Sequence, residues 1–571
     1  MNKQDIIESP IWRLFEKGRN YHRRVGIYAD TDRNFRMYNG DQWDGAQLGD
    51  IQPVQINFIK PIVKYKLSVI HSNLFAIKYS SMNFENRAFR ANAERYCEML
   101  NGYAARVWEK DKMDKIGRGV TKDAAINDEG IVYVNFDPET MFPTNERLDK
   151  NDVYYGNEND DNIQNQPYIL IKKRMAVVNA VDFALDAGLS PEKADWIRGD
   201  NDNFEEAGEA AKIELDDMVT VVYKLYKQNG TVHYSVATRF VTIVEDVDLG
   251  IKLYPVAHYT WEEKKGSARG EGEVRGYIPN QIEVNKTEMR RVLTVKYQAF
   301  PQKVVDVNKV QNPAALNTVG SVIKVNNATV DDVHKAVGTL PPAQMSTDVK
   351  TLVDDLVSIT RELAGAGEAA TGQVNPESAS GRAILAVQQA SQAPMTEQTE
   401  AYKDFLEDLA KIWLDYLIAY SKNGVKLEVK TTDETGKEMI QLERVPQSAL
   451  EQLQASVKID VTPKTPFDKF AQEMTIENLM NQGYFNVQRL PELKAYVNAL
   501  DDDSVAPKMK LMQIIEYMEA EQRKIAEIEA RTQMMLQNAS QFLNGDPDAQ
   551  ASQIAGARQQ LAAQAAQKEQ V

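Results

Sequence analysis

Hydrophobic residues follow two different spacings along this chain. Apolar residues that recur every three or four positions predict amphipathic helices, and apolar residues that alternate with polar ones predict strands. The helical spacing covers residues 8–38, 58–70, 84–110, 278–298, 347–363, 375–420, 465–483, 490–500 and 505–537, and Thr465-Pro466 marks the start of the helix at 465. The strand pattern covers residues 130–136, 218–247, 253–261 and 425–461. Within it, Asn229-Gly230 predicts the tight turn of a hairpin, and a second turn is predicted at 433–436. The chain is therefore predicted to be an α+β protein that is predominantly helical.

The stretch from Trp261 to Ser391 has an unusual order of elements. A glycine-rich turn, Gly270 to Gly276, precedes the helix at 278–298, and a compact strand-like segment follows at 300–340. The helix at 347–363 then returns. Two helices that leave and return around a small β module predict a projecting stalk with a tip, a shape that suits a ring subunit around a channel better than a compact enzyme.

Charged residues near the N-terminus and in two acidic loops are expected to be exposed. In the first helix an apolar patch is predicted at Ile11, Trp12, Leu14 and Phe15, whereas the exposed side chains are expected to be Arg19, His22, Arg23 and Arg24. The acidic loops cover residues 149–162, which include Glu158, and residues 200–217. Their spacing is not that of an EF-hand, so solvated surface loops are predicted rather than calcium sites.

Composition narrows the class of protein. The chain has 571 residues, of which 43% are hydrophobic and 26% charged, which is typical of a soluble protein with several domains. No apolar run reaches the length of a membrane span, and the N-terminus lacks the apolar core of a signal peptide, so we expect a cytosolic protein without a membrane partner. The one cysteine, Cys97, excludes an internal disulfide and is expected to be a buried helix residue.

The net charge of −16 bears on nucleic acid. Proteins that hold DNA through its phosphates are usually basic along one face, so tight wrapping of DNA is not expected. An acidic surface that DNA passes without sticking fits the charge, and so does an acidity that only keeps the protein soluble.

No catalytic, cofactor or metal site is predicted. The turn from Gly270 to Gly276 fails the dinucleotide fingerprint, because Arg275 stands where the third glycine is needed and Glu271 and Glu273 would face the phosphates. The five histidines have no ligand spacing, and neither a nucleophile elbow nor a zinc-protease pair occurs.

The two stalk helices and the loop after them hold the candidate functional residues. Narrow apolar seams run through Ile278, Ile282, Met289, Val292 or Leu293, and Lys296, and through Leu352, Leu356, Ile359 and Leu363. Such seams suit helix packing either within a subunit or around a ring. The polar candidates on these helices are Gln281, Asn285, Arg290, Arg291, Asp354, Asp355 and Arg361. The following small-residue loop fits a mobile element near an axis or a plain linker, and its candidates are Gly365, Gly367, Glu368, Thr371, Gly372 and Gln373.

Two sets of motifs resemble the portal proteins of tailed bacteriophages. The first set is Tyr38-Asn39-Gly40-Asp41-Gln42-Trp43 followed by Pro53-Val54-Gln55-Ile56-Asn57. The second set is Gly276-Tyr277-Ile278-Pro279-Asn280-Gln281-Ile282-Glu283-Val284-Asn285 and, after the stalk, Pro376-Glu377-Ser378-Ala379-Ser380-Gly381-Arg382-Ala383-Ile384. The likeness is to the group with an aromatic–Gly–Asp–Gln–Trp signature near the N-terminus. The sequence departs from that group in having Gln52 where an arginine is often expected, and its C-terminal helical tail is short for a tall barrel.

The resemblance implies a portal-type ring subunit with wing, stem, clip and crown. The implied parts are an N-terminal wing at 1–268, stem helix 1 at 269–298, a clip at 299–342, stem helix 2 at 343–364, a tunnel loop at 365–376, a kinked wing helix and wing strands at 377–463, a helical crown at 464–543 and an Ala/Gln-rich tail at 544–571.

The resemblance also implies a function. The protein would form a homo-oligomer, a dodecamer, at one vertex of the virion capsid, assembled in the host cytoplasm. Double-stranded DNA would pass through it without sequence specificity during packaging and ejection. The implied partners are the terminase large subunit, a head–tail adaptor, the major capsid protein and the scaffold. A different head–tail connector or scaffold-binding virion protein, and an enzyme with an unrecognised site, are the alternative interpretations.

Overall fold

The computed structural model describes residues 8–43, 52–81, 87–200, 217–318, 320–326, 329, 335–341, 345–346, 348–366, 393–432, 438–452, 455–463, 478–480, 493, 496–497 and 508–543. The chain divides into two compact units, Met1–Thr462 and Pro463–Val571. Helices hold more of the described residues than strands do, so the predicted α+β class with more helix than strand is confirmed.

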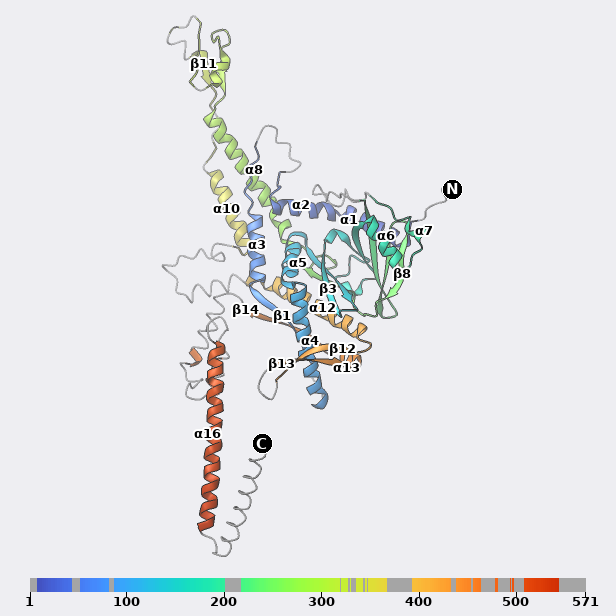
Figure 1. Cartoon of the computed structure of the whole chain (residues 1–571). Coiled ribbons are helices and arrows are strands. Elements are labelled where there is room, and N and C mark those ends of the chain that lie inside the picture. The colour runs from blue at the N-terminus through green and yellow to red at the C-terminus, as the bar shows by residue number, and fades with distance from the viewer. Residues whose placement is uncertain are drawn as a thin grey trace. The chain divides into compact units, whose positions relative to one another are not determined.

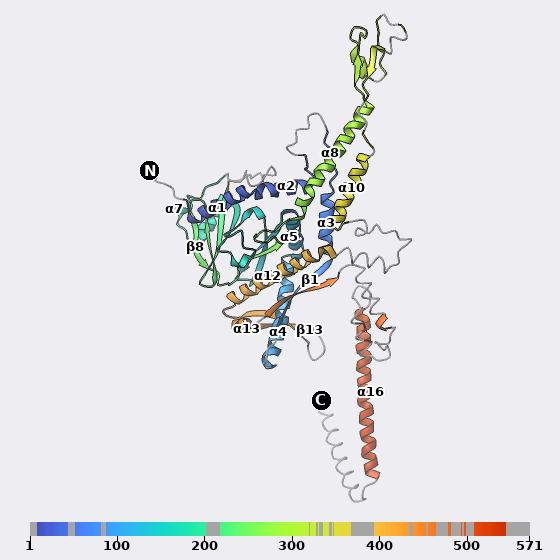
Figure 2. The same cartoon turned by 180° about the vertical axis from the view of Figure 1, so that it is seen from behind.

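The helices of the first unit agree with most of the predicted ones (Figures 1 and 2). They are α1 (Pro10–Val25), α2 (Ile27–Asn39), α3 (Ile59–Ile70), α4 (Arg87–Lys110), α5 (Met113–Asn127), α6 (Val177–Asp186), α7 (Pro191–Ala194), α8 (Glu273–Ala299), α10 (Asp348–Leu363), α12 (Thr396–Tyr420) and α13 (Gln447–Gln452). Helix α5 is not among the predicted helices. Its buried face includes small and polar residues (Gly117, Thr121, Ala124 and Asn127), which give a weak hydrophobic pattern.

Two antiparallel sheets form most of the β-structure of the first unit. The larger sheet has the order β4-β5-β6-β7-β8, with strands at Val153–Tyr155, Ile169–Ala176, Met218–Gln228, Thr231–Ala237 and Thr242–Asp248. The smaller sheet has the order β3-β2-β9, with strands at Phe142–Leu148, Glu129–Asp137 and Val256–Thr260. The predicted hairpin is confirmed, because Asn229 and Gly230 connect β6 to β7 with φ of 53° and 88°, the left-handed values of a type I′ turn.

Three further strand pairs are short or local. β12 (Val425–Thr432) pairs with β13 (Glu438–Val445), which confirms the strands predicted there, and the predicted turn at 433–436 lies outside the described residues. β1 (Asn73–Ser81) neighbours β14 (Ala455–Pro463), and β10 (Lys303–Val305) pairs with β11 (Val337–Thr339).

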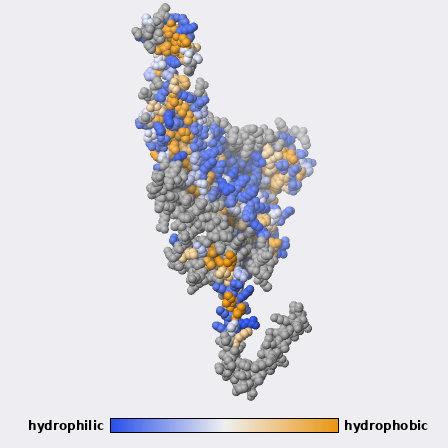
Figure 3. Space-filling model, turned by 60° about the vertical axis from the view of Figure 1, so that its left-hand side comes forward, coloured by the Kyte–Doolittle hydropathy of each residue, from blue (hydrophilic) through white to orange (hydrophobic). Residues whose placement is uncertain are grey.

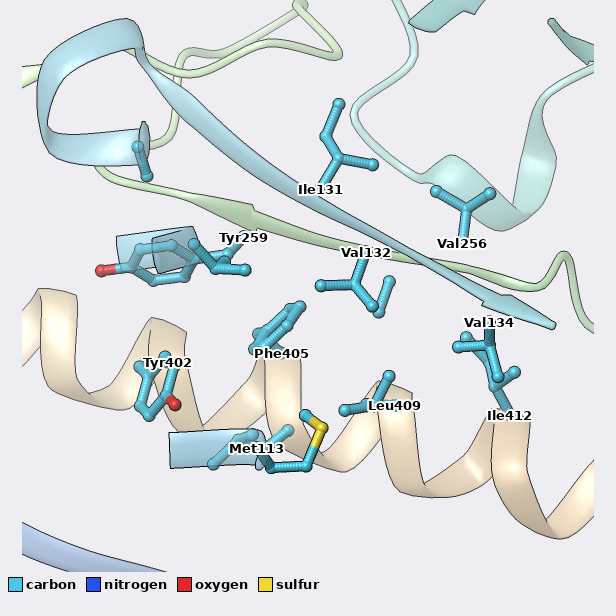
Figure 4. Close-up of a cluster of buried hydrophobic side chains, with 14 of the residues drawn as sticks. Met113, Ile131, Val132, Val134, Val256, Tyr259, Tyr402, Phe405, Leu409 and Ile412 are labelled. Atoms are coloured by element: carbon cyan, nitrogen blue, oxygen red, sulfur yellow. The ribbon is translucent and has the colours of Figure 1, made fainter. Parts of the chain in front are cut away.

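The main core lies between the smaller sheet and α12 (Figure 4). Val132 and Val134 of β2 and Tyr259 of β9 point toward Phe405 and Leu409 of α12, and all five side chains are buried. A short 3-10 turn, Ala393–Met395, contains Pro394 and precedes α12, so the helix begins after the proline, which would have cost it a backbone donor. Cys97 on α4 is buried, as predicted.

The N-terminal helices contradict one prediction. Arg19 and His22 were expected on the exposed face of the first helix, but both are buried. Arg19 donates a hydrogen bond to Glu16 (2.8 Å) and lies over the Phe15 ring, while His22 belongs to a buried charge cluster. The helical pattern assigns both residues to solvent because they are polar, whereas Arg19 pairs with a residue of its own helix and His22 with distant charged residues.

Helix α8 and helix α10 run side by side, and the tip segment, residues 300–341, connects their far ends (Figure 1). The helices predicted at 278–298 and 347–363 are thereby confirmed, although α8 begins one turn earlier. The tip segment holds the small β10–β11 sheet and exposes apolar side chains at Phe300, Val304, Val307 and Val322. Figure 3 shows hydrophobic surface on this tip and on the paired helices next to it.

The second unit contains one long described helix, α16 (Lys508–Leu543), which confirms the helix predicted at 505–537. Several of its apolar side chains are exposed, among them Ile525, Ile528 and Met535. The helix start predicted at Thr465 and the Ala/Gln-rich tail from Asn544 lie outside the described residues.

Candidate functional site: the α8–α10 pair and its root

The glycine-rich turn before α8 is shaped by close backbone packing. The amide of Gly272 donates to Oδ1 of Asp128 (2.8 Å), and a Cβ at Gly270 would lie 2.5 Å from the carbonyl oxygen of Glu262. Only glycine fits so close to neighbouring backbone. These contacts account for Gly270 and Gly272 without a bound nucleotide.

The first turn of α8 is fixed by its own carboxylate. Glu273 accepts hydrogen bonds from Lys66 Nζ (2.5 Å) and from Trp261 Nε1 (2.7 Å), and Tyr277 donates its hydroxyl to the same carboxylate. A carboxylate in the first turn also interacts favourably with the helix dipole. The start of α8 is therefore tied to α3 and to the end of β9.

A buried charge cluster, defined here as Arg269, Glu129, Glu158, His22 and His258, lies next to this root. The Arg269 guanidinium forms ion pairs with Glu129 and with Glu158 (Nε to Oε2, 2.9 Å). It also donates to the carbonyl oxygen of Val153 (2.9 Å) and to Nε2 of His22 (3.0 Å). His258 Nε2 lies 2.6 Å from Glu129. One arginine thus joins α1, the two sheets and the chain entering α8.

Burial and pairing shift the pKa values within the charge cluster. Burial alone would raise the pKa of Glu129, but Arg269 and His258 lower it to about 2. Burial would also raise the pKa of Glu158, yet Arg269 and His22 leave it lowered. Burial lowers the pKa of His22 to about 4, so this imidazole is neutral at pH 7 and accepts from Arg269. Both carboxylates are therefore charged and the histidine is not.

Glu158 corrects a second prediction. The loop 149–162 was expected to be a solvated acidic loop, but the Glu158 side chain is about one-tenth exposed and paired with Arg269. Strands of both sheets lie between Glu158 and Arg269 in the chain, so the sequence gives no sign that these two side chains meet. An arginine directly before the glycine turn is the signal that could have suggested a buried partner for the acidic loop.

Lowering the pH is expected to destabilise the protein through His22. Its pKa is about 4 when folded and about 6.5 when unfolded, so the unfolded chain binds more protons between these values and stability falls as pH drops from 6.5 toward 4. Between pH 7 and 4.5 this amounts to about 2 kcal/mol. Thermal unfolding of the parent and of His22→Gln at several pH values measures it.

The parent midpoint should fall more steeply than that of His22→Gln across this window. Both proteins contain the same carboxylates, so the contributions of these groups largely cancel in the comparison and the difference between the two profiles reports on His22. Parallel pH profiles for the two proteins would contradict a neutral buried His22.

Gln281 and Asn285 of α8 hold the segment after α2. Gln281 accepts from the amide of Phe58 (3.1 Å) and donates to the carbonyl oxygen of Ile56 (2.6 Å). Asn285 accepts from the amide of Ile56 (3.1 Å) and donates to Oε1 of Gln42 (2.6 Å). Both amide side chains are buried, so in this chain they face the segment after α2 and not open solvent.

The two motif sets quoted from the sequence therefore meet in space. Asn57 donates to the carbonyl oxygen of Tyr38 (3.0 Å), and Trp43 donates to that of Val54 (2.9 Å), which closes the first set on itself. The Gln42–Asn285 bond then connects it to the second set. Both sets are evident in the sequence, but nothing there indicates their contact, because 243 positions separate Gln42 from Asn285.

The predicted apolar seam is only partly buried within the chain, since Ile282 and Leu356 are half-buried against the core whereas the other seam residues of α10 are exposed. On α10 the buried residues are Val353 and Thr360, and Asn280 of α8 donates to the Thr360 hydroxyl (3.0 Å). Of the predicted seam, Leu352, Ile359 and Leu363 are 49%, 52% and 81% exposed. Ile278 is buried, but it belongs to the main hydrophobic core of the chain. The exposed Leu352, Ile359 and Leu363 agree with the alternative in which the seam of α10 packs against another subunit of a ring.

The charged candidates lie on the outer surfaces of the pair. Arg290 lies 3.9 Å from Glu283 and Arg291 lies 2.7 Å from Glu288. The other three, Asp354, Asp355 and Arg361, are exposed on α10. The Arg290–Glu283 pair is exposed and contributes little to stability, whereas Glu288, the partner of Arg291, is buried.

Most of the predicted tunnel loop lies outside the described residues. These are Gly367, Glu368, Thr371, Gly372 and Gln373, together with the motif at 376–384. Gly365 is described and has φ of 70°, which favours glycine, and it lies just after the end of α10. Its neighbour Ala366 is buried.

Two other kinds of site are absent from the described residues. No helix among them has the length and hydropathy needed to span a membrane. No group of three or more histidine, cysteine, aspartate or glutamate side chains in the same part of the chain is arranged to hold a metal ion.

Comparison with known proteins gives one family. A search of curated protein sequences finds no match. The sequence model of the family described as Phage P22-like portal protein matches residues 19–570, which include the charge cluster, both helices of the pair, the tip segment and α16. Because this match covers nearly the whole chain, the protein belongs to the phage P22-like portal protein family.

Proposed function

We propose that this protein forms a ring of about a dozen copies at one vertex of the capsid and that double-stranded DNA enters and leaves the head through the ring. In this proposal α8 and α10 are the stem, the tip segment is the clip, residues 365–376 are the tunnel loop and residues 464–543 are the crown. Residues 1–268 and 377–463 form the wing. The role is structural and non-enzymatic, and a separate terminase drives packaging.

The observation that carries the ring is the apolar surface of the stem. Leu352, Ile359 and Leu363 are half or more exposed on a helix whose neighbouring positions are buried against α8. Large apolar side chains repeated along one exposed helix face are typical of a surface that another chain covers. A ring covers this surface in every copy, whereas a monomer leaves it in water.

The tip segment supports docking of further proteins. Its exposed apolar side chains, Phe300, Val307 and Val322, are each at least three-quarters exposed, and they lie at the far end of the paired helices. A small exposed apolar surface at this position is better suited to binding transient partner proteins than to forming part of a hydrophobic core. We propose the terminase large subunit and later the head–tail adaptor as those partners, and the major capsid protein and scaffold as partners of the wing.

The net charge of −16 fits a channel that passes DNA without sequence preference. Phosphates are repelled by an acidic wall, so the DNA can slide. A nonsense mutation of this gene in its phage, with and without a plasmid copy, tests the function. We expect heads without packaged DNA in the mutant and filled heads when the plasmid copy is present. DNA-filled heads in the mutant alone would contradict the proposal.

A further inference from the structure

The outer sides of the two stem helices carry opposite charges that find no partner within one chain. On α8, Lys286 is exposed and has no carboxylate within ion-pairing distance among the described residues. On α10, the exposed carboxylates Asp355 and Glu362 likewise have no described cation within that distance. These groups face away from each other inside the chain, so an intramolecular pair cannot form.

Helical periodicity places the charges on the sides of α8 and α10 that point away from the contact between them. Asn280 of α8 touches Thr360 of α10, and a residue two positions along a helix lies about 200° around it. On α8, the row of residues that starts at Asn280 and repeats every three or four positions faces α10. The residues two positions after the members of that row are Ile282, Lys286, Met289 and Leu293. On α10, Asp355 and Glu362 follow the buried Val353 and Thr360 by two positions.

Each far side combines charge with apolar surface. The far side of α8 has the half-buried Met289 and Leu293 beside Lys286, and it includes Ile282, which also packs against the core of its own chain. On α10, Leu352 and Ile359 precede Asp355 and Glu362 by three positions each. The two apolar side chains therefore lie about 60° around the helix from the two carboxylates. The two surfaces are thus complementary in sign and both partly apolar.

We propose that the far side of α8 in one copy packs against the far side of α10 in the next copy, with Lys286 paired to Asp355. This inference rests on the ring of the proposed function. It makes the ring contact heterologous, since each copy offers two different surfaces, and such contacts close into rings when the rotation allows. Charge complementarity across the contact also selects one orientation of the neighbour.

The heights of the two residues agree with this pairing. The helices run in opposite directions, and Asn280 and Thr360 mark one level. Lys286 lies six residues beyond Asn280 and Asp355 five residues before Thr360, so they lie about 9 Å and about 7.5 Å toward the tip. Copies in a closed ring are related by rotation without a rise, so in a ring whose axis runs along the paired helices, residues at one height in a chain stay at one height across the contact.

Charge reversal tests the pairing in the full-length protein. Lys286→Glu and Asp355→Lys should each lower the fraction of rings at least about tenfold, at a concentration where the parent is mainly ring, because like charges then face each other. The double variant Lys286→Glu with Asp355→Lys should restore the rings. Lys264→Glu, an exposed lysine outside the stem, changes the net charge by the same amount as Lys286→Glu and should leave the rings intact. Mass photometry measures the ring fraction, and circular dichroism checks that every variant is folded.

The outcomes separate the pairing from the ring itself. Absence of rings in the parent would overturn the proposed function. Normal rings in both single variants, or a double variant no better than the singles, would overturn this pairing alone. Normal rings of Lys286→Glu that hold packaged DNA less well would also overturn the pairing, and would instead place the far side of α8 in the channel.

Discussion

Replacing Arg269 by methionine is expected to lower the free energy of unfolding by about 3–5 kcal/mol. Glu129 is wholly buried and Glu158 nearly so, and both are charged because the arginine lowers their pKa values. Without the guanidinium two carboxylates remain buried beside each other, together with the unpaired carbonyl oxygen of Val153. Removing one member of a buried ion pair costs far more than an exposed pair is worth.

Thermal unfolding of Arg269→Met beside Arg275→Met tests this. Arg275 lies a little further along the chain, is about half exposed and lies 3.6 Å from Asp30, so its loss should cost less than about 1 kcal/mol. Adding Glu129→Gln to Arg269→Met should recover part of the loss. Equal midpoints for the two arginine variants would contradict a structural role for the charge cluster.

The second large effect is expected at a glycine inside the smaller sheet. Gly130 of β2 lies opposite Tyr259 of β9, and a Cβ there would lie 2.3 Å from the carbonyl oxygen of Val120 on α5. Backbone cannot yield as a flexible side chain does, so Gly130→Ala must separate α5 from the sheet. We expect a loss of about 3 kcal/mol, at the upper end of the cost of overpacking.

Gly276→Ala is the matched control for Gly130→Ala. Gly276 lies in α8, is exposed and has no neighbouring atom within 4 Å of the position that a Cβ would take, so alanine should raise helix stability by about 1 kcal/mol. The two substitutions add the same methyl group with opposite expected signs. Chemical denaturation measures both, and a Gly130→Ala variant as stable as the parent would disprove the close approach of α5.

The elements of the fold could be predicted from local pattern, and their partners could not. Asn229-Gly230 fixes its hairpin within four residues, and the apolar spacing of α8 and α10 fixes two helices. Helix α5 escapes prediction because its buried face is made of small and polar residues. His22 was predicted to lie in solvent because its partner Arg269 is 247 positions away.

The stem illustrates the same limit at the candidate site. Gln281 and Asn285 are predicted from the sequence as polar stem residues, but only the structure shows that both bind the backbone or side chains of the segment after α2. The apolar seam predicts a surface for helix packing and leaves open whether the partner lies in the same chain or in a ring. Because Val353 and Thr360 are the residues buried within the chain, Leu352 and Ile359 remain for another copy. The sequence pattern shows that a helix face is apolar, whereas the side chains that cover this face depend on where the other elements of the fold lie.

Electron microscopy of the purified full-length protein is the most direct test of the proposed ring. We predict closed rings of about a dozen copies with a central hole wide enough for duplex DNA, with α8 and α10 of neighbouring copies packed around that hole. Monomers at every salt and protein concentration, or closed particles without a hole, would contradict the proposed function.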